Sequence, residues 1–218
     1  PSQTCGGNLR DLVFLKIINW RNKKCIVHIH GGYYRQLIDH DVPSWQRKMN
    51  YQAVRRLAGG IVLGHSLHSI FEGMLPDDRI FVCPNCVDDA FIAPSVDEKI
   101  NKIKDGGALH ILYLSNFIES KGYREVLELA KLAADRGDSD KFVFHFAGKF
   151  FDQEEQNYFE EHSKALANVI YHGIVGGQDK VDLLNQCHIF SLLSRYPNEG
   201  QPISILEAMG NGMAIITT

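Results

Sequence analysis

In the second half of the chain, short apolar runs alternate with longer segments whose apolar positions follow helical spacing. The apolar runs predicted to be strands cover residues 109–114, 142–147, 168–171, 189–193 and 214–216. The segments predicted to be helices cover residues 123–134, 152–166 and 180–185, and a further helix begins at Pro202. Short buried strands that alternate with helices are typical of a parallel sheet covered on both faces. We therefore predict an α/β fold for this half.

The first half of the chain shows a similar alternation with shorter strands. The segments with helical spacing are residues 6–20, 44–57 and 66–74, and the apolar runs are residues 25–27, 61–63 and 80–82. Residues 95–107 are polar and bounded by Pro and Gly, which is typical of a linker. We therefore predict two domains, residues 1–94 and 108–218, joined by this linker.

Composition narrows the class of protein. Hydrophobic residues make up 44% and aromatic residues 10% of the 218 residues, which is ordinary for a soluble globular protein with a buried core. The net charge of −3 argues against a general nucleic-acid binder. A membrane-spanning helix would need a run of about eighteen apolar residues, and the sequence contains none. The five cysteines are odd in number and scattered, which is typical of reduced cytoplasmic thiols.

Charge is divided unevenly along the chain. The first 95 residues carry eleven Lys and Arg against eight Asp and Glu, and the remaining residues carry twelve against eighteen. The predicted helix over residues 44–57 has a basic face formed by Arg47, Lys48, Arg55 and Arg56. The simplest interpretation of this face is a solvated surface, and contact with an acceptor phosphate or an anionic membrane is the alternative.

Residues 195–218 contain more candidate functional groups than any other stretch of the chain. They are predicted to form a loop, a helix, a turn and a strand, in that order. Glu199 stands just before the predicted helix, and Glu207 stands about two turns along it. Between the two carboxylates lie the first N–H groups of the helix region, those of Gln201, Ile203 and Ser204. A helix N-terminus binds anions because its unsatisfied donors and its dipole point the same way. The layout therefore fits a ligand with hydroxyls at both ends and phosphate in the middle, such as a nucleotide sugar.

A strand that runs into His28-Ile29-His30-Gly31-Gly32 allows three interpretations. Histidines two residues apart on a strand point to the same face and could bind a metal, but no third ligand follows at a suitable spacing. One core histidine and one loop histidine are the second possibility. The third is a functional loop, because ligands of parallel sheets gather beyond the carboxyl ends of strands.

A second loop of this kind follows the predicted strand over residues 109–114. Lys121 lies in it just before a helix, where a lysine can meet a phosphate as a flexible point charge. An exposed lysine that simply starts the helix is the alternative.

Cys83 and Cys86 have the spacing of a redox or zinc pair. A redox pair would stand at the start of a helix, and a zinc site would need a second pair of ligands. Neither condition is met in the sequence, so a structural turn is the favoured interpretation.

Several of these segments resemble one protein family. The string EGQPISILEAM, residues 199–209, resembles the E-x7-E segment of retaining GT-B glycosyltransferases of family 4, the glycosyl transferases group 1. Lys121-Gly122 resembles the end of the family's diphosphate-binding segment G-R-x-x-x-x-K-G, in which Ser115 and Asn116 take the places of Gly and Arg. One of two expected cations is therefore missing, although Asn116 can still donate a hydrogen bond.

Two further segments of the first half resemble the same family. The strand and loop that contain His30 resemble those of the acceptor-side domain, and Pro84, Asn85, Val87 and Asp88 match a PN-x-V-D turn at the end of that domain. The resemblance implies that Glu199 and the adjoining amides hold the donor sugar, and that Glu207 holds the ribose. The implied catalytic residues are His30 and Glu199, the implied donor-binding residues are Asn116, Lys121, Gly200, Gln201, Pro202, Ile203, Ser204 and Glu207, and no metal is implied.

The resemblance also implies a GT-B fold, with two Rossmann-like halves that face a cleft. Residues 1–94 would form a partial acceptor-side domain, and residues 108–218 an incomplete domain that binds the nucleotide-sugar donor. Relative to the family, the chain lacks the start of the first domain and the last strands and closing helix of the second.

The implied activity is transfer of a hexosyl unit from a nucleotide-diphosphate sugar, with a UDP-sugar as the favoured donor, to a saccharide or glycolipid acceptor. The anomeric configuration would be retained without an essential metal, in polysaccharide assembly in the cytoplasm or at the inner face of the plasma membrane. A non-catalytic fragment that binds nucleotide sugars is one alternative, which binding without transfer would reveal. A thiol or zinc protein built on Cys83 and Cys86 is another, which bound zinc or a titratable disulfide would reveal.

Overall fold

The structure, a computed structural model, describes residues 4–93, 95–104 and 106–218. The chain forms two compact units. The N-terminal unit contains the residues up to Asn85 together with Pro197–Gln201, and the C-terminal unit contains Cys86–Tyr196 and Pro202–Thr218. Each unit is built on a parallel sheet, of three strands in the first and five in the second, which confirms the predicted α/β class.

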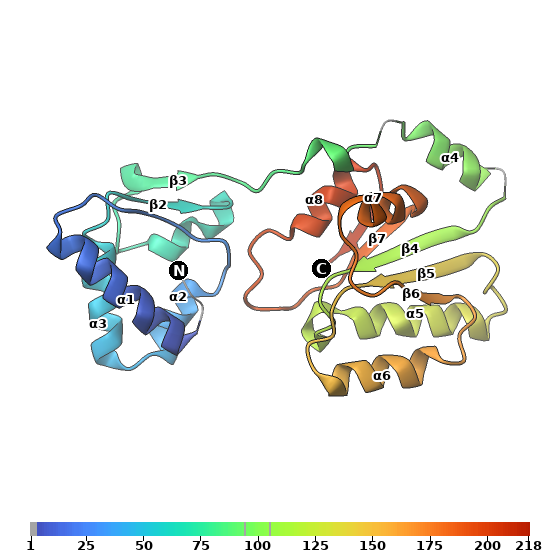
Figure 1. Cartoon of the computed structure of the whole chain (residues 1–218), viewed down its shortest axis with the longest axis horizontal. Helices are drawn as coiled ribbons and strands as arrows, with labels where there is room; N and C mark the ends of the chain where they lie inside the picture. The colour runs from blue at the N-terminus through green and yellow to red at the C-terminus, as the bar shows by residue number, and fades with distance from the viewer. Residues whose placement is uncertain (1–3, 94, 105) are drawn as a thin grey trace. The chain divides into compact units, whose positions relative to one another are not determined.

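The sheet of the N-terminal unit has the strand order β1-β2-β3, and all of its pairs are parallel. Its strands are β1 (Ile26–His28), β2 (Gly59–Val62) and β3 (Ile80–Val82). Its helical segments are α1 (Cys5–Trp20), α2 (Tyr34–Gln36), a π-helical turn (Leu37–Asp41), α3 (Ser44–Val54), and 3-10 turns over His65–Phe71 and Asp77–Arg79. Figure 1 shows α1 and α3 lying next to each other, in agreement with their contacts.

A buried amide pair joins α1 to α3. Asn8 and Asn50 exchange two side-chain hydrogen bonds of 2.8 Å each, and Gln46 donates a third to Asn8 at 2.9 Å. Because buried amides are costly unless they are paired, these contacts fix one helix against the other. At its start α1 is capped by Thr4, whose hydroxyl accepts a hydrogen bond from the Gly7 N–H.

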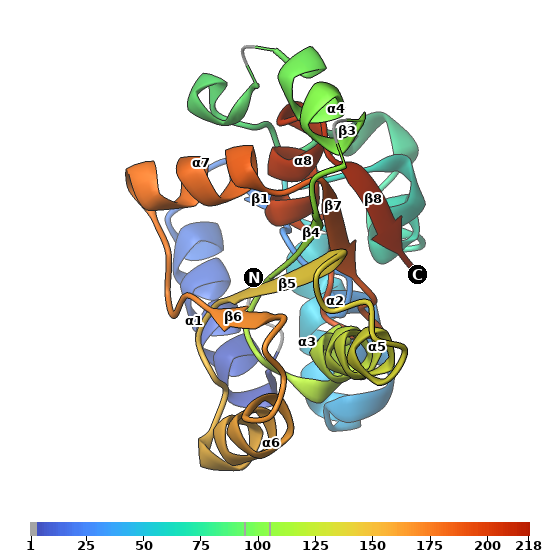
Figure 2. The ribbon, with the colours of Figure 1, turned by 90° about the vertical axis from the view of Figure 1, so that its right-hand side faces the viewer.

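The sheet of the C-terminal unit has the strand order β6-β5-β4-β7-β8. Its strands are β4 (Leu109–Leu114), β5 (Phe142–Ala147), β6 (Val169–Tyr171), β7 (Ile189–Leu192) and β8 (Ala214–Thr217). Its helices are α4 (Asp97–Lys104), α5 (Tyr123–Asp135), α6 (Gln153–Ser163), α7 (Gly177–Gln186) and α8 (Ile203–Gly210), with 3-10 turns over Asp89–Phe91 and Glu119–Lys121. Helices α5 and α6 lie on one face of this sheet, and α4, α7 and α8 lie on the other (Figures 1 and 2).

The order of these strands creates a switch point next to β4. The chain runs outward from β4 to β5 and β6, and then returns to the other side of β4 with β7 and β8. The connections after β4 and β7 therefore leave the sheet side by side and turn to opposite faces. In parallel sheets, ligands bind beyond the carboxyl ends of the strands at such a point.

The structure differs from the predicted linker and domain boundary. The two units divide after Asn85, and the predicted linker over residues 95–107 contains α4. The Lys99 side chain of this helix is buried and donates to the carbonyls of Leu184 and Cys187, at 2.8 and 3.0 Å, and to the Asn211 side chain. The composition resembles that of a linker because the segment is polar, and the buried contacts described for this helix are made by a lysine. Within the predicted domains and linker, Pro1–Gln3, Pro94 and Asp105 lie outside the described residues.

No helix among the described residues is long and apolar enough to cross a membrane.

Candidate functional site

The connection after β4 holds Lys121 at the carboxyl end of the five-stranded sheet. Its ammonium lies 3.3 Å from the Ser115 hydroxyl and 5.2 Å from the centre of the Tyr196 ring. Asn116 is exposed, and its carbonyl accepts a hydrogen bond of 2.8 Å from the Tyr113 hydroxyl. The β4–α5 connection thus presents one cation and one exposed amide at the switch point.

Glycine at position 122 allows this connection to meet the end of β7. Gly122 has a φ of +78°, and a Cβ built on it would lie 2.4 Å from the Leu193 carbonyl oxygen. The Arg195 N–H donates to the Ser120 carbonyl at 2.6 Å, so the connections after β4 and β7 are in direct contact. Only glycine satisfies both the positive φ and the close approach.

The second connection leads into α8, whose first turn lacks a side-chain cap because Pro202 occupies the N-cap position. The amide groups of Ile203 and Ser204 lie in this first turn. An uncapped helix start directed to the carboxyl edge of a sheet attracts anions through its free donors and its dipole.

Glu207, one turn further along α8, is buried. Only 5% of the residue is exposed, and its Oε1 and Oε2 atoms lie 2.7 and 2.6 Å from the Lys180 ammonium. Lys180 belongs to the first half of α7 and also lies over the Phe91 ring, 5.1 Å from its centre. A buried carboxylate is costly unless a cation faces it, so Lys180 explains how Glu207 is tolerated in this position.

A second group of contacts ties α7 to α8 near their C-terminal ends. The Asn211 amide donates to the Asn185 side chain at 2.8 Å, and the buried Lys99 ammonium contacts Asn211 as well as the last carbonyls of α7. The Lys180–Glu207 pair is therefore held between two helices that are fixed to each other.

In the N-terminal unit, the loop after β1 packs closely against residues 199–201. A Cβ on Gly200 would lie 2.4 Å from the His30 carbonyl oxygen, and a Cβ on Gly32 would lie 2.6 Å from the Glu199 carbonyl oxygen. Glycine at both positions lets the two backbones touch. The structure thus brings His30, Glu199 and Gly200 together within one unit, although they are far apart in the sequence.

Gln201 is held by Asn85, a contact that the sequence did not indicate. The Asn85 N–H donates to the Gln201 side chain at 2.7 Å, and the Asn85 side chain donates to the Gln201 carbonyl at 2.9 Å. Asn85 follows β3 in the turn between Cys83 and Cys86, which are both free thiols. This turn therefore has a structural use that does not involve the sulfur atoms.

The rings of His28 and His30 lie 4.1 Å apart, centre to centre. Burial lowers the pKa of His28, and the neighbouring His30 lowers it further. Among the residues that the structure describes, no three His, Cys, Asp or Glu side chains are arranged to hold a metal ion.

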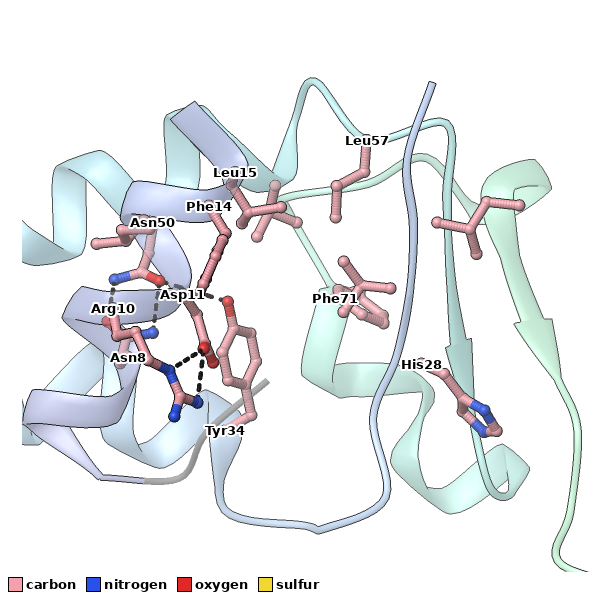
Figure 3. Close-up of a pocket in the computed structure, with 14 residues that line it drawn as sticks. Asn8, Arg10, Asp11, Phe14, Leu15, His28, Tyr34, Asn50, Leu57 and Phe71 are labelled. Carbon is pink, nitrogen blue, oxygen red and sulfur yellow. Dashed lines mark hydrogen bonds and ion pairs between the residues drawn. The ribbon is translucent and has the colours of Figure 1, made fainter. Parts of the chain in front are cut away.

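A separate pocket of about 590 Å³ lies between α1 and β1 (Figure 3). Phe14 and Leu15 line it from α1, and His28 lines it from the end of β1. Burial raises the pKa of Tyr34, whose hydroxyl points to Asn50 at 3.4 Å. No residue predicted to bind the donor lines this pocket.

Of the predicted site residues, the C-terminal unit holds Asn116, Lys121, Pro202, Ile203, Ser204 and Glu207, and the N-terminal unit holds His30, Glu199, Gly200 and Gln201. Sequence reasoning missed Lys180 and Asn85. Lys180 belongs to no recognised motif, and its position beside Glu207 depends on how α7 and α8 pack. Asn85 was recognised only as a turn residue.

Comparison with known proteins identifies the family of this architecture. The family model for glycosyl transferases group 1 matches residues 95–218, which is more than half of the chain. A search of curated proteins finds no significant match.

Solved structures with a similar fold include Alr3699/HepE of Anabaena in complex with UDP-glucose, at 16% identity and a TM-score of 0.67, over 95% of this chain and 57% of that chain. The pneumococcal O-GlcNAc transferase GtfA in complex with UDP and GlcNAc is similar at 13% identity and a TM-score of 0.65, over 94% of this chain and 39% of that chain. A UDP-forming α,α-trehalose-phosphate synthase from Burkholderia vietnamiensis is similar at 10% identity and a TM-score of 0.69, over 94% of this chain and 55% of that chain.

The chain therefore spans between 39% and 57% of the length of these three proteins. At such low identities the likeness shows the fold, and it confirms the predicted GT-B type. Together with the family match over the C-terminal unit, it leads to one conclusion. The chain belongs to the glycosyl transferases group 1 family.

Proposed function

We propose that this chain binds a nucleotide-diphosphate sugar and transfers its sugar to an acceptor. The observation that carries the proposal is the buried Glu207, which lies behind the uncapped start of α8 at the switch point of the sheet. A buried carboxylate with one cation beside it retains lone pairs that can accept hydrogen bonds from a diol. The ribose of a nucleotide offers such a diol.

The neighbouring groups suit the diphosphate. The N–H groups of Ile203 and Ser204 at the start of α8 and the ammonium of Lys121 after β4 can face phosphate oxygens. Donors that are already in place stabilise the charge that develops on a leaving nucleoside diphosphate, without reorganising during the reaction. In this role Lys121 is the cation of the β4–α5 connection, and Asn116 contributes a neutral donor.

We assign the sugar end of the donor to His30, Glu199 and the backbone of Gly200 and Gln201. Support comes from the packing of this loop against the loop after β1, and from the two hydrogen bonds by which Asn85 holds Gln201. In the transfer, the bond between sugar C1 and the diphosphate oxygen breaks and a bond from C1 to an acceptor hydroxyl oxygen forms. The hydroxyl proton leaves with the nucleoside diphosphate.

The finer assignment is a hexosyl transfer with retention of configuration, from a UDP-sugar to a saccharide or glycolipid. UDP accompanies the ligands in the structures of HepE and GtfA, which favours uridine as the base here. In this proposal the N-terminal unit forms the acceptor side and the C-terminal unit forms the donor side.

A transfer assay with UDP-glucose tests the proposal. Glu199→Gln should reduce transfer by at least about 100-fold, as the loss of an important transition-state contact does, while UDP affinity stays within about threefold. Glu128→Gln, an exposed change on α5, is the matched control and should leave transfer unchanged. Full transfer by Glu199→Gln would remove this carboxylate from the sugar site.

The second candidate function is binding of a nucleotide sugar without catalysis. It is favoured by the single cation of the β4–α5 connection, where Ser115 and Asn116 add no charge. UDP binding with neither transfer nor hydrolysis of UDP-glucose would establish this second function in place of the first.

A further inference from the structure

The turn that carries Lys121 is held from a neighbouring helix by a buried carboxylate. Glu155 of α6 is 8% exposed, and its Oε1 atom accepts a hydrogen bond of 3.0 Å from the N–H of Glu119, the first residue of the 3-10 turn Glu119–Lys121. The first N–H groups of a helical turn have no partner within it, so this carboxylate satisfies a donor that the turn cannot satisfy. Glu155 thus holds one end of the turn, and the cation of the proposed phosphate site lies at the other end.

The second oxygen of Glu155 binds the start of α5. Its Oε2 atom accepts hydrogen bonds from the Tyr123 hydroxyl at 2.5 Å and from the Arg124 guanidinium at 2.8 Å. Burial by itself would raise the pKa of Glu155, but the hydrogen bonds from Tyr123, Arg124 and Glu119 together outweigh it and hold this pKa below its usual value. Glu155 is therefore ionised at neutral pH, and it joins both the turn and the helix that follows to α6.

Glu155 and its partner Arg124 are themselves fixed in place. The Asp152 side chain caps α6 by accepting a hydrogen bond of 3.0 Å from the Glu155 N–H. The Arg124 guanidinium lies over the Tyr158 ring, 4.1 Å from its centre, and 3.3 Å from the Glu119 carboxylate. Helices α5 and α6 lie side by side, so these contacts bridge two packed elements (Figures 1 and 2). Arg124 is therefore engaged with α6, and Lys121 remains the cation of the connection that we assign to the phosphates.

Two backbone contacts hold the same connection on either side of Glu119. The Phe117 N–H donates to the Lys149 carbonyl at 2.9 Å, which joins the connection after β4 to the one after β5. The Ser120 carbonyl accepts from the Arg195 N–H at 2.6 Å, which joins it to the connection after β7. Between these contacts, Glu155 attaches the turn to α6. The turn is therefore held from three neighbouring segments.

We propose that Glu155 is a positioning residue of the donor site, which fixes the turn that presents Lys121 to a nucleoside diphosphate. The proposal rests on the function proposed above, because it requires that the chain binds such a ligand. A lysine is a point charge on a flexible side chain, so its contact with a phosphate depends on where the backbone places it. Glu155 touches no part of the donor in this proposal and acts through Lys121.

A role of Glu155 in stability alone would give a different pattern of binding. Loss of the carboxylate leaves the donors of Tyr123 and Arg124 without their partner, so it lowers the free energy of unfolding in either case. A residue that acts on stability alone leaves the affinity of the folded protein unchanged. A residue that positions Lys121 lowers the affinity for ligands that carry phosphates and spares ligands that do not.

Binding of UDP and of uridine, measured by NMR titration, tests the proposal. Lys121→Gln should lower the affinity for UDP by about tenfold, the loss expected for one contact with a charged group. Glu155→Ala should lower it by about fivefold and leave the affinity for uridine within about twofold of the wild type. The double variant should bind UDP as Lys121→Gln does, because a residue that acts through Lys121 has nothing to position once the lysine is gone.

Two controls separate positioning from stability. Glu154→Ala removes an exposed carboxylate next to Glu155 and should leave the affinity for UDP unchanged. Asn168→Ala removes a buried hydrogen bond of 3.1 Å to the Ala130 carbonyl of α5, so it should lower the thermal stability but not the affinity for UDP. If Glu155→Ala does not fold, Glu155→Gln replaces it. Glutamine fills the same space but offers a single acceptor oxygen to three donors.

The outcomes distinguish this inference from the function on which it rests. If Lys121→Gln weakened UDP binding and the folded Glu155 variant did not, the positioning role would be overturned and the proposed function would stand. Equal losses for UDP and uridine, or losses that add in the double variant, would also overturn the positioning role. Failure of the wild type to bind UDP would overturn the proposed function, and the inference with it.

Discussion

At the scale of single residues, the buried pair of Glu207 and Lys180 distinguishes the site from an ordinary helix. The spacing of Glu199 and Glu207 could be read from the sequence, but burial of the second carboxylate could not. An exposed glutamate on α8 would have fitted the same spacing. Lys180 stands 27 residues before Glu207, and its role follows only from the packing of α7 on α8.

Gly122 shows how one residue shapes the proposed phosphate site. Its backbone has a φ of +78°, and a side chain would meet the Leu193 carbonyl at the end of β7. Gly137 has almost the same φ, +76°, but has nothing within 4 Å of a built Cβ. Alanine at either position would therefore adopt an unfavourable positive φ, but only alanine at position 122 would also clash with a neighbouring residue.

We expect Gly122→Ala to lower the free energy of unfolding by about 3 kcal/mol, and Gly137→Ala by about 1 kcal/mol. The backbone conformation contributes about 1 kcal/mol to both, and displacement of the β7 end accounts for the difference. Urea denaturation of the two variants and the wild type gives the measurement. Equal losses would show that the contact with Leu193 is not needed.

At the scale of secondary-structure elements, the parallel sheets were predictable and the anchoring of α4 was not. Alternating apolar runs and helical segments in residues 109–218 predicted β4 to β8 to within a few residues. The segment that became α4 has a polar composition, and its attachment depends on the buried Lys99 ammonium. A pattern of hydrophobic positions cannot reveal a contact made by a lysine with helix-end carbonyls.

A row of histidines crosses the five-stranded sheet, from the residue before β7, through β4 and β5, to the residue after β6. The backbone N–H of His110 donates to His188 Nδ1 at 3.0 Å. Between the rings, His110 Nδ1 lies 2.7 Å from His145 Nε2, and His145 Nδ1 lies 2.8 Å from His172 Nε2. A hydrogen bond between two imidazoles requires one ring nitrogen without a proton. Burial, together with the neighbouring histidines, lowers the pKa of the fully buried His145 to about 4, and burial lowers that of His172.

This row predicts a loss of stability in weak acid. His145 takes up a proton near pH 6.5 in the unfolded chain and near pH 4 in the folded chain. Between these values the unfolded state binds more protons, so the contribution of His145 to stability is fully present above pH 6.5 and is lost as the pH falls toward 4. The wild type should therefore be less stable to urea at pH 5 than at pH 7.5.

In the variant His145→Gln, the free energy of unfolding should differ less between pH 5 and pH 7.5 than it does in the wild type. Glutamine keeps a hydrogen-bonding group but does not titrate. His162→Gln, at an exposed position of α6, serves as the control and should behave as the wild type does. If the stability of His145→Gln depended on pH as that of the wild type does, protonation of His145 would not be the cause of the loss.

At the scale of the whole molecule, the family match covers residues 95–218, and most of these residues belong to the C-terminal unit, which holds the proposed nucleotide site. The C-terminal unit contains the switch point of the five-stranded sheet, the start of α8 and the buried carboxylate of Glu207. The N-terminal unit provides His30 and the segment 199–201. The family resemblance located Glu207, whereas the contact between Lys180 and Glu207 became visible only in the packing of α7 on α8.

The most direct test of the central claim is whether Glu207 recognises a ribose. We would measure by calorimetry the affinities of UDP and 2′-deoxy-UDP for the wild type and for Glu207→Gln. The account predicts that the wild type prefers UDP by about tenfold, the effect of one net hydrogen bond of about 1.4 kcal/mol, and that Glu207→Gln loses this preference. Equal affinity of the wild type for both nucleotides, or a preference that survives in Glu207→Gln, would contradict the placement of the nucleotide at α8.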